Sequence, residues 1–475
     1  MPSPVRHGAL LGACRAGCAP PWTRRGERLD SLEPVAFDVV IAGGGFGGLY
    51  AARRLERRLP RYSARIIVVS DVNFLLYSPL LPGAAAGSLE PRHVVVPLRE
   101  ELEWADLRLG RVTGADPAVN ELYMRTLDER DETLRYDQLV VALGSVSRVL
   151  PIPGLAEHAL GFKTLADAIA VRNRALVNLE IAESLPDDES RREYLTFVFV
   201  GAGYAGVEGI AELQDYVNAT IERYPRCRAA GTRWIIADVL DRIMPEIPES
   251  LAEFASQELR GRGIELRTGT RLESMDEQSA VLSTGERVPT RTVCWTAGVK
   301  PPAIVKQLGL PLTKGDRIET DSCMRVKDQH NVWAIGDAAA VPDPAQRRKA
   351  PSPPTAQHAI RQGRVVGSNV AAALAGKNPR PFRYRTLGVF VDLGQHKAVA
   401  TMLGFRLRGF PAWFAARTYH LAMMPGMARR VRLAADWTVG LLFGRASAEL
   451  GQLGHPPSLG TYLDEARQQD EAPGQ

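Results

Sequence analysis

Two glycine-rich turns of the same design stand far apart in the chain, and each follows an apolar, β-rich run. Their glycines share the G-x-G-x-x-G spacing and are Gly43, Gly45 and Gly48 in the first turn and Gly201, Gly203 and Gly206 in the second. Such a turn lets the backbone approach a pyrophosphate, which then rests on the N–H groups and the positive dipole end of the following helix. Two of these turns predict a redox enzyme that holds two dinucleotides at once, and the natural pair is a flavin and a nicotinamide.

A dinucleotide site of this kind also needs an acceptor for the adenosine ribose, usually an acid at the end of the second strand. In the second half of the chain, Asp238 follows the apolar run 234–237. A carboxylate there repels a 2′-phosphate, so we expect NADH to be preferred over NADPH; the alternative is a solvated acid at a strand end. Ser70 occupies the matching position in the first half. A serine can hydrogen-bond a ribose, but it is a weaker signal of a dinucleotide site than the acid in the second half.

Two more carboxylates lie next to expected strands or turns. Glu208 falls in the first turn of the helix after the second glycine turn, where the helix dipole would stabilise it even as a purely structural acid. Asp337 follows Gly336 at the end of the strand-like run 331–337. A strand-terminal acid in a flavin-binding half can accept hydrogen bonds from a polyhydroxyl chain such as the ribityl group.

The bulk composition is that of an ordinary globular protein. The chain has 475 residues, of which 45% are hydrophobic and 24% charged, and its net charge of +5 gives no support to nucleic-acid binding. This length suffices for about three domains. No run reaches the roughly 18 uncharged apolar residues that a spanning helix needs. Cys14 and Cys18 with His7 offer too few ligands for a metal site, so we expect no metal.

The apolar runs outline two nucleotide-binding units. Strands are expected at 37–42, 65–70 and 136–144 in the first unit, and at 196–200, 233–238 and 292–298 in the second. Small-residue turns close these units at Gly144 and at Ala297-Gly298. The run 331–337 belongs spatially with the first unit, so two separate segments should build that unit.

Five short motifs follow one another in a fixed order. They are N-F-L-L-Y-S-P-L-L at 73–81, G-V-E at 206–208, A-G-V-K at 297–300, A-I-G-D at 334–337 and P-T-A-Q-H-A-I-R-Q-G at 354–363. This set resembles the type II NADH:quinone oxidoreductases, single-chain flavoproteins of the two-dinucleotide-binding-domain superfamily. The resemblance implies an α/β fold with two Rossmann-like domains, arranged as in glutathione reductase, with FAD in the first and NADH in the second.

The resemblance also implies the site residues. Gln357 and Gln362 would lie beside the flavin, where the quinone head group docks, because an amide can donate to a quinone carbonyl without adding charge. Without the resemblance, two such glutamines on a helix would more often be surface residues. Glu208 completes the expected catalytic set. The expected FAD-binding residues are Gly43, Gly45, Gly48, Ser70, Pro79, Gly144, Gly336, Asp337 and Ala356. The expected NADH-binding residues are Gly201, Gly203, Gly206, Asp238, Ala297 and Gly298.

Cysteine usage separates this chain from neighbouring classes of flavoprotein. Disulfide reductases and sulfide:quinone reductases need a pair of cysteines beside the flavin, because thiol exchange uses two adjacent sulfurs. Neither arrangement is visible among the five cysteines, which are few and scattered, as expected in a reducing cytoplasm.

The expected reaction is the transfer of two electrons from NADH through FAD to a membrane quinone, either ubiquinone or menaquinone, without proton pumping. Two alternatives remain open. One is a soluble flavoprotein reductase of a protein partner such as a ferredoxin, and the other is a redox sensor that binds NADH but turns over slowly.

The C-terminal region is expected to dock on an anionic membrane surface. Its apolar candidates are Trp413, Phe414, Leu421, Met423 and Met424, together with Leu433, Trp437 and Leu441 at helical spacing. The basic candidates are Arg429, Arg430, Arg432 and Arg445. The expected location is the cytoplasmic face of the cell membrane, as a peripheral protein. The alternative is a helix packed on the enzyme's own core or at the interface of a homodimer.

The expected domain boundaries follow from these assignments. They are a disordered extension at 1–34, the first segment of the FAD-binding domain at 35–155, the NADH-binding domain at 156–300, the second FAD-binding segment with the quinone-site helix at 301–385, and the membrane-association region and tail at 386–475.

Overall fold

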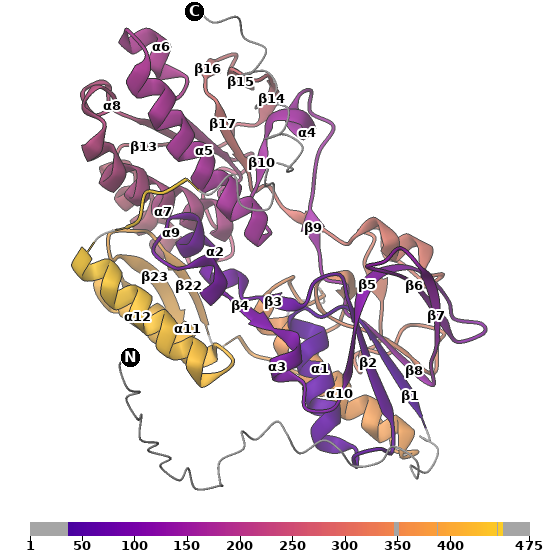
Figure 1. Ribbon diagram of the computed structural model, residues 1–475. Helices are drawn as coiled ribbons and strands as arrows, with labels where there is room; N and C mark the ends of the chain where they lie inside the picture. The colour runs from indigo at the N-terminus through magenta and orange to yellow at the C-terminus, as the bar shows by residue number, and fades with distance from the viewer. Residues whose placement is uncertain (1–36, 346–350, 387, 444, 450–475) are drawn as a thin grey trace, which may run out of the picture.

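The computed structural model describes residues 37–345, 351–386, 388–443 and 445–449. Figure 1 shows two α/β units as separate lobes joined by extended segments, with a C-terminal sheet and two helices along one side. The expected extension at 1–34 lies outside the described residues, and so do Cys14 and Cys18.

The first unit is built on a seven-stranded sheet. Its strands, in spatial order, are β20 (Val332–Ala334), β8 (Gln138–Val141), β1 (Asp38–Ala42), β2 (Arg65–Ser70), β5 (Asp106–Asp116), β6 (Glu121–Thr126) and β7 (Asp131–Arg135). The strands from β20 to β5 are parallel, and β6 and β7 continue the sheet as antiparallel neighbours. Parallel strands covered on both faces consist of continuous apolar runs, which is why Val39, Val40 and Ile41 of β1 are all fully buried.

This sheet joins two distant segments of the chain. Trp333 in β20 donates a hydrogen bond to the side chain of Gln138 in β8, which lies 195 positions earlier in the sequence. The pairing confirms that the run 331–337 belongs with the first unit. Helices α1 (Phe46–Arg58) and α10 (Ala356–Leu374) pack closely against each other. Their backbones approach because Gly363 has no side chain, and a Cβ there would lie 2.4 Å from the carbonyl oxygen of Gly47.

The second unit contains a five-stranded parallel sheet. Its strands, in spatial order, are β10 (Leu160–Gly161), β17 (Thr292–Trp295), β11 (Thr196–Val200), β12 (Arg233–Ala237) and β13 (Ile264–Arg267). The longer helices of this unit are α5 (Leu165–Ser184), α7 (Tyr204–Thr220) and α9 (Glu249–Gly261). A three-stranded antiparallel sheet completes it, with β14 (Leu272–Met275), β15 (Ser279–Leu282) and β16 (Arg287–Pro289).

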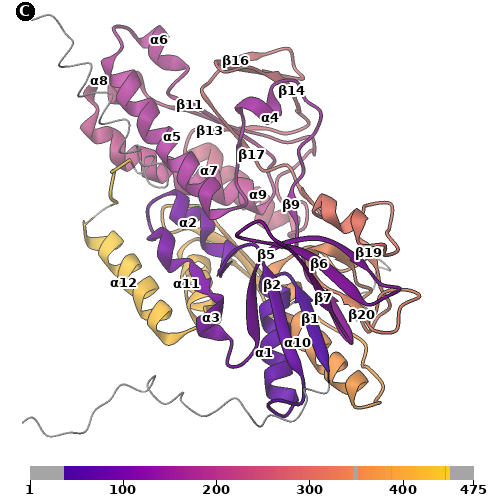
Figure 2. The ribbon, with the colours of Figure 1, turned by 45° about the vertical axis from the view of Figure 1, so that its right-hand side comes forward.

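Shorter elements lie within these units and between them. They are β3 (Phe74–Leu76), α2 (Leu81–Ala85), β4 (Val95–Pro97), α3 (Leu98–Glu101), β9 (Val146–Ser147), α4 (Leu155–His158), α6 (Asp188–Arg192), α8 (Pro225–Ala230), β18 (Val299–Lys300), β19 (Ile318–Glu319) and β21 (Ala339–Ala340). The two connections between the units pair with each other as β9 and β18, so the chain enters and leaves the second unit at one place (Figure 2).

The C-terminal region forms a small antiparallel sheet and two helices. The sheet contains β22 (Gly388–Asp392), β23 (Ala398–Met402) and β24 (Phe405–Arg408), and the helices are α11 (Gly409–Met423) and α12 (Met427–Phe443). Strand β22 lies against α7 of the second unit, and α11 packs on the small sheet. Among the described helices, none is both long and apolar enough to span a membrane.

The helical spacing predicted for α12 is present, but only part of its expected apolar face is exposed to solvent. Leu433 is fully buried and Trp437 packs against the core of the first unit. Arg429 is also buried, and it forms ion pairs of 2.9 Å with Glu100 and Glu101. These contacts exclude Leu433 and Arg429 from a membrane surface, because the first unit already covers them.

Candidate active site

The first glycine turn leaves open space at the start of α1. Gly43 has φ +116°, and a Cβ there would lie 2.3 Å from the carbonyl oxygen of Ala142. A Cβ on Gly48 would lie 1.8 Å from the carbonyl oxygen of Gly43. Gly45, which precedes the first helical residue, has no atom within 4 Å of its Cβ position. The turn is therefore closed on its inner side and open at the helix N-terminus, which is the shape that a pyrophosphate requires.

The second glycine turn repeats this geometry at the start of α7. A Cβ on Gly201 would lie 2.7 Å from the backbone nitrogen of Ala297, and one on Gly206 would lie 1.8 Å from the oxygen of Gly201. Gly203 again has open space around its Cβ position. Gly298 turns the chain away after β17 with φ +90°. Both turns thus fit the dinucleotides expected for them, FAD in the first unit and NADH in the second.

The two expected ribose acceptors lie beside their turns. The Asp238 carboxylate accepts hydrogen bonds from the backbone N–H of Ala202 at 2.5 Å and of Leu240 at 2.8 Å. Ser70 ends β2 and is buried, and its Oγ lies 2.6 Å from the Cβ position of Gly44. Each side chain is therefore held against the backbone that a nucleotide would approach.

The Gly336-Asp337 pair lies beside the end of β8. Ser145, the residue after Gly144, donates a hydrogen bond of 2.6 Å to the Asp337 carboxylate. The backbone N–H of Gly336 donates to Oε1 of Gln362 at 2.7 Å. These contacts assemble the predicted residues Gly144, Gly336 and Asp337 in one place, and they add Ser145, which the sequence analysis did not single out.

Gln362 is placed differently from the expectation that it lines a quinone pocket. Its side chain is 1% exposed, and its amide oxygen is bonded to the backbone of the Gly336 turn. Residues five positions apart on an α-helix point about 140° away from each other, so Gln357 and Gln362 face different surroundings. Gln362 supports the Gly-Asp turn of the first unit.

Gln357 lies near the start of α10, after Ala356 and the N-cap residue Thr355. Its amide nitrogen donates to the carbonyl oxygen of Gly388 at 3.0 Å, and its amide oxygen accepts from the Tyr384 hydroxyl at 2.8 Å. The Arg361 guanidinium stacks over the Tyr384 ring at 4.2 Å. Gln357 is thus fixed in one orientation between α10 and the segment that leads into β22.

A small cavity of about 30 Å³ lies where the loop after β3 meets α7, β22 and α11. Its lining residues include Pro79, Leu80, Glu208, Phe390, Asp392, Arg417 and His420. Pro79, expected near the flavin, and Glu208, expected to be catalytic, therefore border the same space. Pro79 enters this cavity from the Y-S-P-L-L motif of the first unit, whereas Glu208 enters from the second unit.

Glu208 is the partly buried acid at the centre of this region. Its Oε1 accepts a hydrogen bond of 3.0 Å from the backbone N–H of Asp392. Burial raises the pKa of Glu208 to about 8, and the neighbouring carboxyls of Asp392 and Glu212 add to the effect. Burial, followed by the charge of Glu212, raises the pKa of Asp392 to about 7. Both groups can therefore hold a proton near neutral pH.

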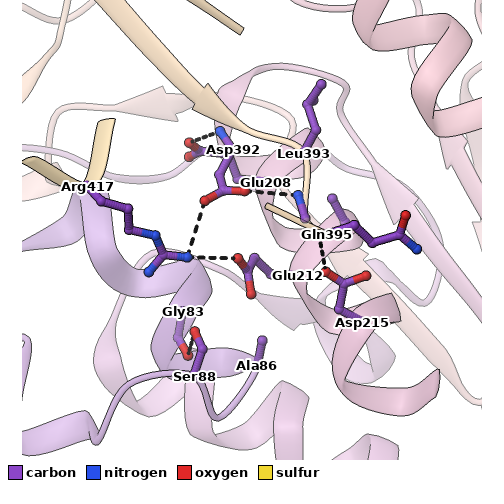
Figure 3. Close-up of polar contacts among 12 residues, drawn as sticks. Gly83, Ala86, Ser88, Glu208, Glu212, Asp215, Asp392, Leu393, Gln395 and Arg417 are labelled. Atoms are coloured by element: carbon purple, nitrogen blue, oxygen red, sulfur yellow. Dashed lines mark hydrogen bonds and ion pairs between the residues drawn. The ribbon is translucent and has the colours of Figure 1, made fainter. Parts of the chain in front are cut away.

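Three arginines compensate most of the buried negative charge here. Arg417 lies 3.4 Å from Asp392 and 3.5 Å from Glu212, between two acids that come from different elements (Figure 3). Two further ion pairs join Arg445 to Glu212 at 3.2 Å and Arg262 to Asp215 at 2.5 Å. The region thus contains three guanidinium groups and four carboxyls, which belong to Glu208, Glu212, Asp215 and Asp392. Within the described residues, no Lys or Arg nitrogen lies within 4.0 Å of the Glu208 carboxyl. Glu208 is therefore the one of these four carboxyls without a direct ion pair, and the more distant charge of Arg417 only partly offsets the rise of its pKa.

His420, which lines the cavity, pairs with Tyr77. The Tyr77 hydroxyl lies 3.4 Å from Nδ1 of His420. Burial lowers the pKa of His420 to about 4 and raises the pKa of Tyr77, so both rings are neutral at pH 7. A lone histidine in the sequence carries no signal of its partners, so only the structure places His420 beside Tyr77.

Thiol and metal chemistry find no support in the described part of the chain. Its three cysteines, Cys227, Cys294 and Cys323, are free and lie in different segments. The described part of the chain also contains no group of three or more His, Cys, Asp or Glu side chains that could hold a metal ion.

The comparisons with known proteins agree with this geometry. A family model described as pyridine nucleotide-disulphide oxidoreductase matches residues 37–363. The type II NADH:quinone oxidoreductase Ndh of Mycobacterium tuberculosis is 30% identical over 434 residues, which span 87% of this chain and 89% of that protein. The chain belongs to the type II NADH:quinone oxidoreductases. The predicted NADH:quinone oxidoreductase activity and the use of FAD and NADH are thereby confirmed.

Two further comparisons extend this assignment. The demethylphylloquinone reductase NdbB of Synechocystis is 30% identical over 409 residues, which span 84% of this type II oxidoreductase and 95% of its relative. The structure of NDH2 from Plasmodium falciparum in complex with NADH superposes with a TM-score of 0.80 at 17% identity, covering 87% of this chain and all of that one. The second likeness confirms the fold of two dinucleotide-binding units.

Proposed function

We propose that the site residues of this type II NADH:quinone oxidoreductase divide the reaction between its two units. FAD, held along the first glycine turn, supplies the two-electron chemistry. The Gly336-Asp337 turn binds its ribityl chain, while Ser70 hydrogen-bonds its adenosine ribose. The second glycine turn and Asp238 hold NADH so that its nicotinamide reaches the flavin at the junction of the units.

Gln357 orients the quinone. Its amide is held by Tyr384 and Gly388, so it presents one fixed edge, and an amide nitrogen carries a second hydrogen that can donate to a quinone carbonyl. The observation that carries this assignment is the placement of Gln357 on α10, the helix that packs directly on α1 behind the first glycine turn.

Glu208 supplies a proton. A hydride from NADH carries two electrons and one proton, whereas the reduction of a quinone to a quinol consumes two electrons and two protons. One more proton must therefore enter the site. Glu208 makes no direct ion pair with a described Lys or Arg and holds a proton near neutral pH, and an acid with a pKa close to the working pH is suited to this transfer. Asp392, which donates its backbone N–H to Glu208, stabilises the carboxylate that the transfer leaves behind.

The C-terminal region docks the enzyme on the cytoplasmic face of the cell membrane. Exposed apolar side chains gather on β24, α11 and α12, and they include Phe405, Phe410, Phe414, Val431, Val439, Leu441, Leu442 and Phe443. Exposed arginines accompany them at Arg406, Arg408 and Arg432. Basic and apolar side chains together favour an anionic lipid surface, and a membrane quinone, ubiquinone or menaquinone, reaches the pocket from that side.

The half-reactions test the role of Gln357. In stopped-flow measurements, Gln357→Leu should leave the reduction of FAD by NADH within about two-fold of wild type, whereas reoxidation by a quinone should slow at least roughly ten-fold, the cost of one lost hydrogen bond of this kind. Gln257→Leu changes an exposed glutamine of α9 and serves as the control. Slow reduction by NADH combined with normal reoxidation would move Gln357 to the nicotinamide side.

A further inference from the structure

A lysine of the second unit reaches the Gly-Asp turn of the first unit. The Lys163 ammonium donates to Oγ of Ser145 at 3.0 Å, and the Ser145 hydroxyl donates to Oδ2 of Asp337 at 2.6 Å. The direct distance from the ammonium to the carboxylate is 3.9 Å. The serine hydroxyl is therefore the bridge, since it accepts from the cation and donates to the anion, and hydrogen bonds to charged groups are the stronger kind.

The backbone around Lys163 is fixed within the second unit. Phe162 is buried and packs edge-on against Phe199 of β11. On the other side, Thr164 is the N-cap of α5, and the Asp167 carboxylate accepts from the N–H groups of both Lys163 and Thr164 at 2.8 Å. The backbone of Lys163 is thus held by the second unit, whereas its side chain contacts Ser145 and Asp337 of the first unit.

We propose that Lys163 is a positioning residue for FAD, which acts through Ser145 to fix the Asp337 carboxylate where the ribityl chain binds. The inference rests on the proposed role of Asp337. The hydroxyl of Ser145 occupies one lone pair of Oδ2 and so restricts the rotation of the carboxylate, which leaves its other oxygen directed away from Ser145. The nearby ammonium also adds positive charge beside the flavin, which favours the more negative, reduced state.

Lys163→Met tests both consequences in the holoenzyme. We expect the Kd of FAD, measured from the fluorescence of FAD released on dilution, to rise about ten-fold. We also expect the midpoint potential of the bound flavin to fall. If reduced FAD loses ten-fold more affinity than oxidised FAD, the potential falls by about 30 mV for this two-electron couple.

Matched variants separate the bridge from the charge. Lys163→Arg should restore the potential, because it keeps the cation. Ser145→Ala should weaken FAD binding while shifting the potential less, because the ammonium remains. Lys163→Met combined with Ser145→Ala should weaken FAD no more than the more severe single change, since both remove one bridge. Lys306→Met removes an exposed lysine that pairs with Asp316 at 3.0 Å, and it should alter neither quantity.

The outcomes distinguish this inference from the proposed role of Asp337. Loss of FAD from Asp337→Ala with unchanged Kd and potential in Lys163→Met would overturn the inference alone. Retention of FAD by Asp337→Ala would overturn the assignment of the ribityl site itself. Thermal melting at saturating FAD shows whether each variant is folded, and an unfolded Lys163→Met would leave Ser145→Ala to decide the matter.

Discussion

Glu208 and Asp392 are joined by a hydrogen bond of 3.0 Å from the backbone N–H of Asp392 to the Glu208 carboxyl, although 184 positions separate them in the chain. The bond ties the helix that begins at the NADH turn to the first strand of the C-terminal sheet. Because burial opposes ionisation of both side chains, the junction between these elements depends on pH.

Glu208→Gln should therefore become more stable than wild type as the pH rises. The folded-state pKa of Glu208, about 8, lies above its ordinary value of 4.5. Between these values the unfolded chain has lost the proton that the folded chain keeps, so the stability of the wild type falls with rising pH. Glutamine is neutral throughout and escapes this loss.

The measurement is the melting temperature at pH 5, 6.5 and 8. The difference between Glu208→Gln and wild type should widen in favour of the variant over this range. Glu253→Gln removes an exposed carboxylate from α9 and controls for a change of surface charge. A difference that stays constant with pH would show that Glu208 is ionised in the folded protein.

Gly203→Ala should separate folding from nucleotide binding. Gly203 has φ −72° and ψ −172°, which any residue adopts, and no atom lies within 4 Å of its Cβ position. The variant should melt like wild type, yet its KM for NADH should rise about ten-fold or more, because the added methyl group occupies the space expected for the pyrophosphate.

Two other glycine variants give the comparison. Gly206→Ala should destabilise the fold, because its Cβ would lie 1.8 Å from the oxygen of Gly201. Gly45→Ala, the open position of the first turn, should lower the FAD content and leave the fold intact. Normal kinetics with NADH in Gly203→Ala would remove the second turn from the nucleotide site.

Asp238→Ala should reduce the preference for NADH over NADPH. The change removes an acceptor for the ribose hydroxyls together with the charge that repels a 2′-phosphate. Hydrogen bonds to charged groups contribute about 1.5–3 kcal/mol, so the ratio of kcat/KM for the two nucleotides should fall roughly ten-fold or more. Asp241→Ala, at an exposed neighbouring position, should leave the ratio unchanged. An unaltered ratio in Asp238→Ala would assign this acid to the support of the turn alone.

Liposome flotation tests the C-terminal surface. Truncation after Pro381 is unsuitable, because Phe382, Val391 and Leu433 belong to the buried cores. Instead, Phe410→Ser, Phe414→Ser and Leu442→Ser combined should abolish flotation with anionic vesicles at low salt while preserving reduction of a water-soluble quinone. Val119→Ser with Leu127→Ser alters exposed apolar residues at the far edge of the first unit and should float normally. Flotation of the triple variant would assign this surface to another partner.

The glycine turns were predictable because their spacing is local. A turn that requires positive φ at Gly43 and Gly201 is encoded within a few residues, and the apolar runs beside it gave strands at 65–70 and 196–200 with the bounds that the structure has. Long-range contacts carry no such signal. Nothing next to Lys163 in the sequence indicates Ser145, and nothing near Glu208 indicates Asp392, because only the tertiary fold brings each pair together.

Helix α12 shows that the sequence also does not indicate which parts of a helix surface are covered by the rest of the fold. The spacing of Leu433, Trp437 and Leu441 correctly indicated a helix with one apolar face. Periodicity identifies which residues share a face, but not what covers it. In the structure the first unit covers Leu433 completely and leaves Leu441 exposed, so the predicted membrane face is divided along the length of the helix.

The pairing of β20 with β8 sets the order in which a nascent chain can assemble. Trp333 leaves the ribosome 195 residues after its partner Gln138, which at about 5–20 residues per second is a delay of roughly 10–40 s. The second unit emerges whole during this interval and can fold while the first unit still lacks an edge strand, α10 and the Gly336-Asp337 turn. The ribosome therefore completes the nicotinamide unit before it supplies the last edge strand of the first unit, and FAD can be loaded only after both lobes have been synthesised.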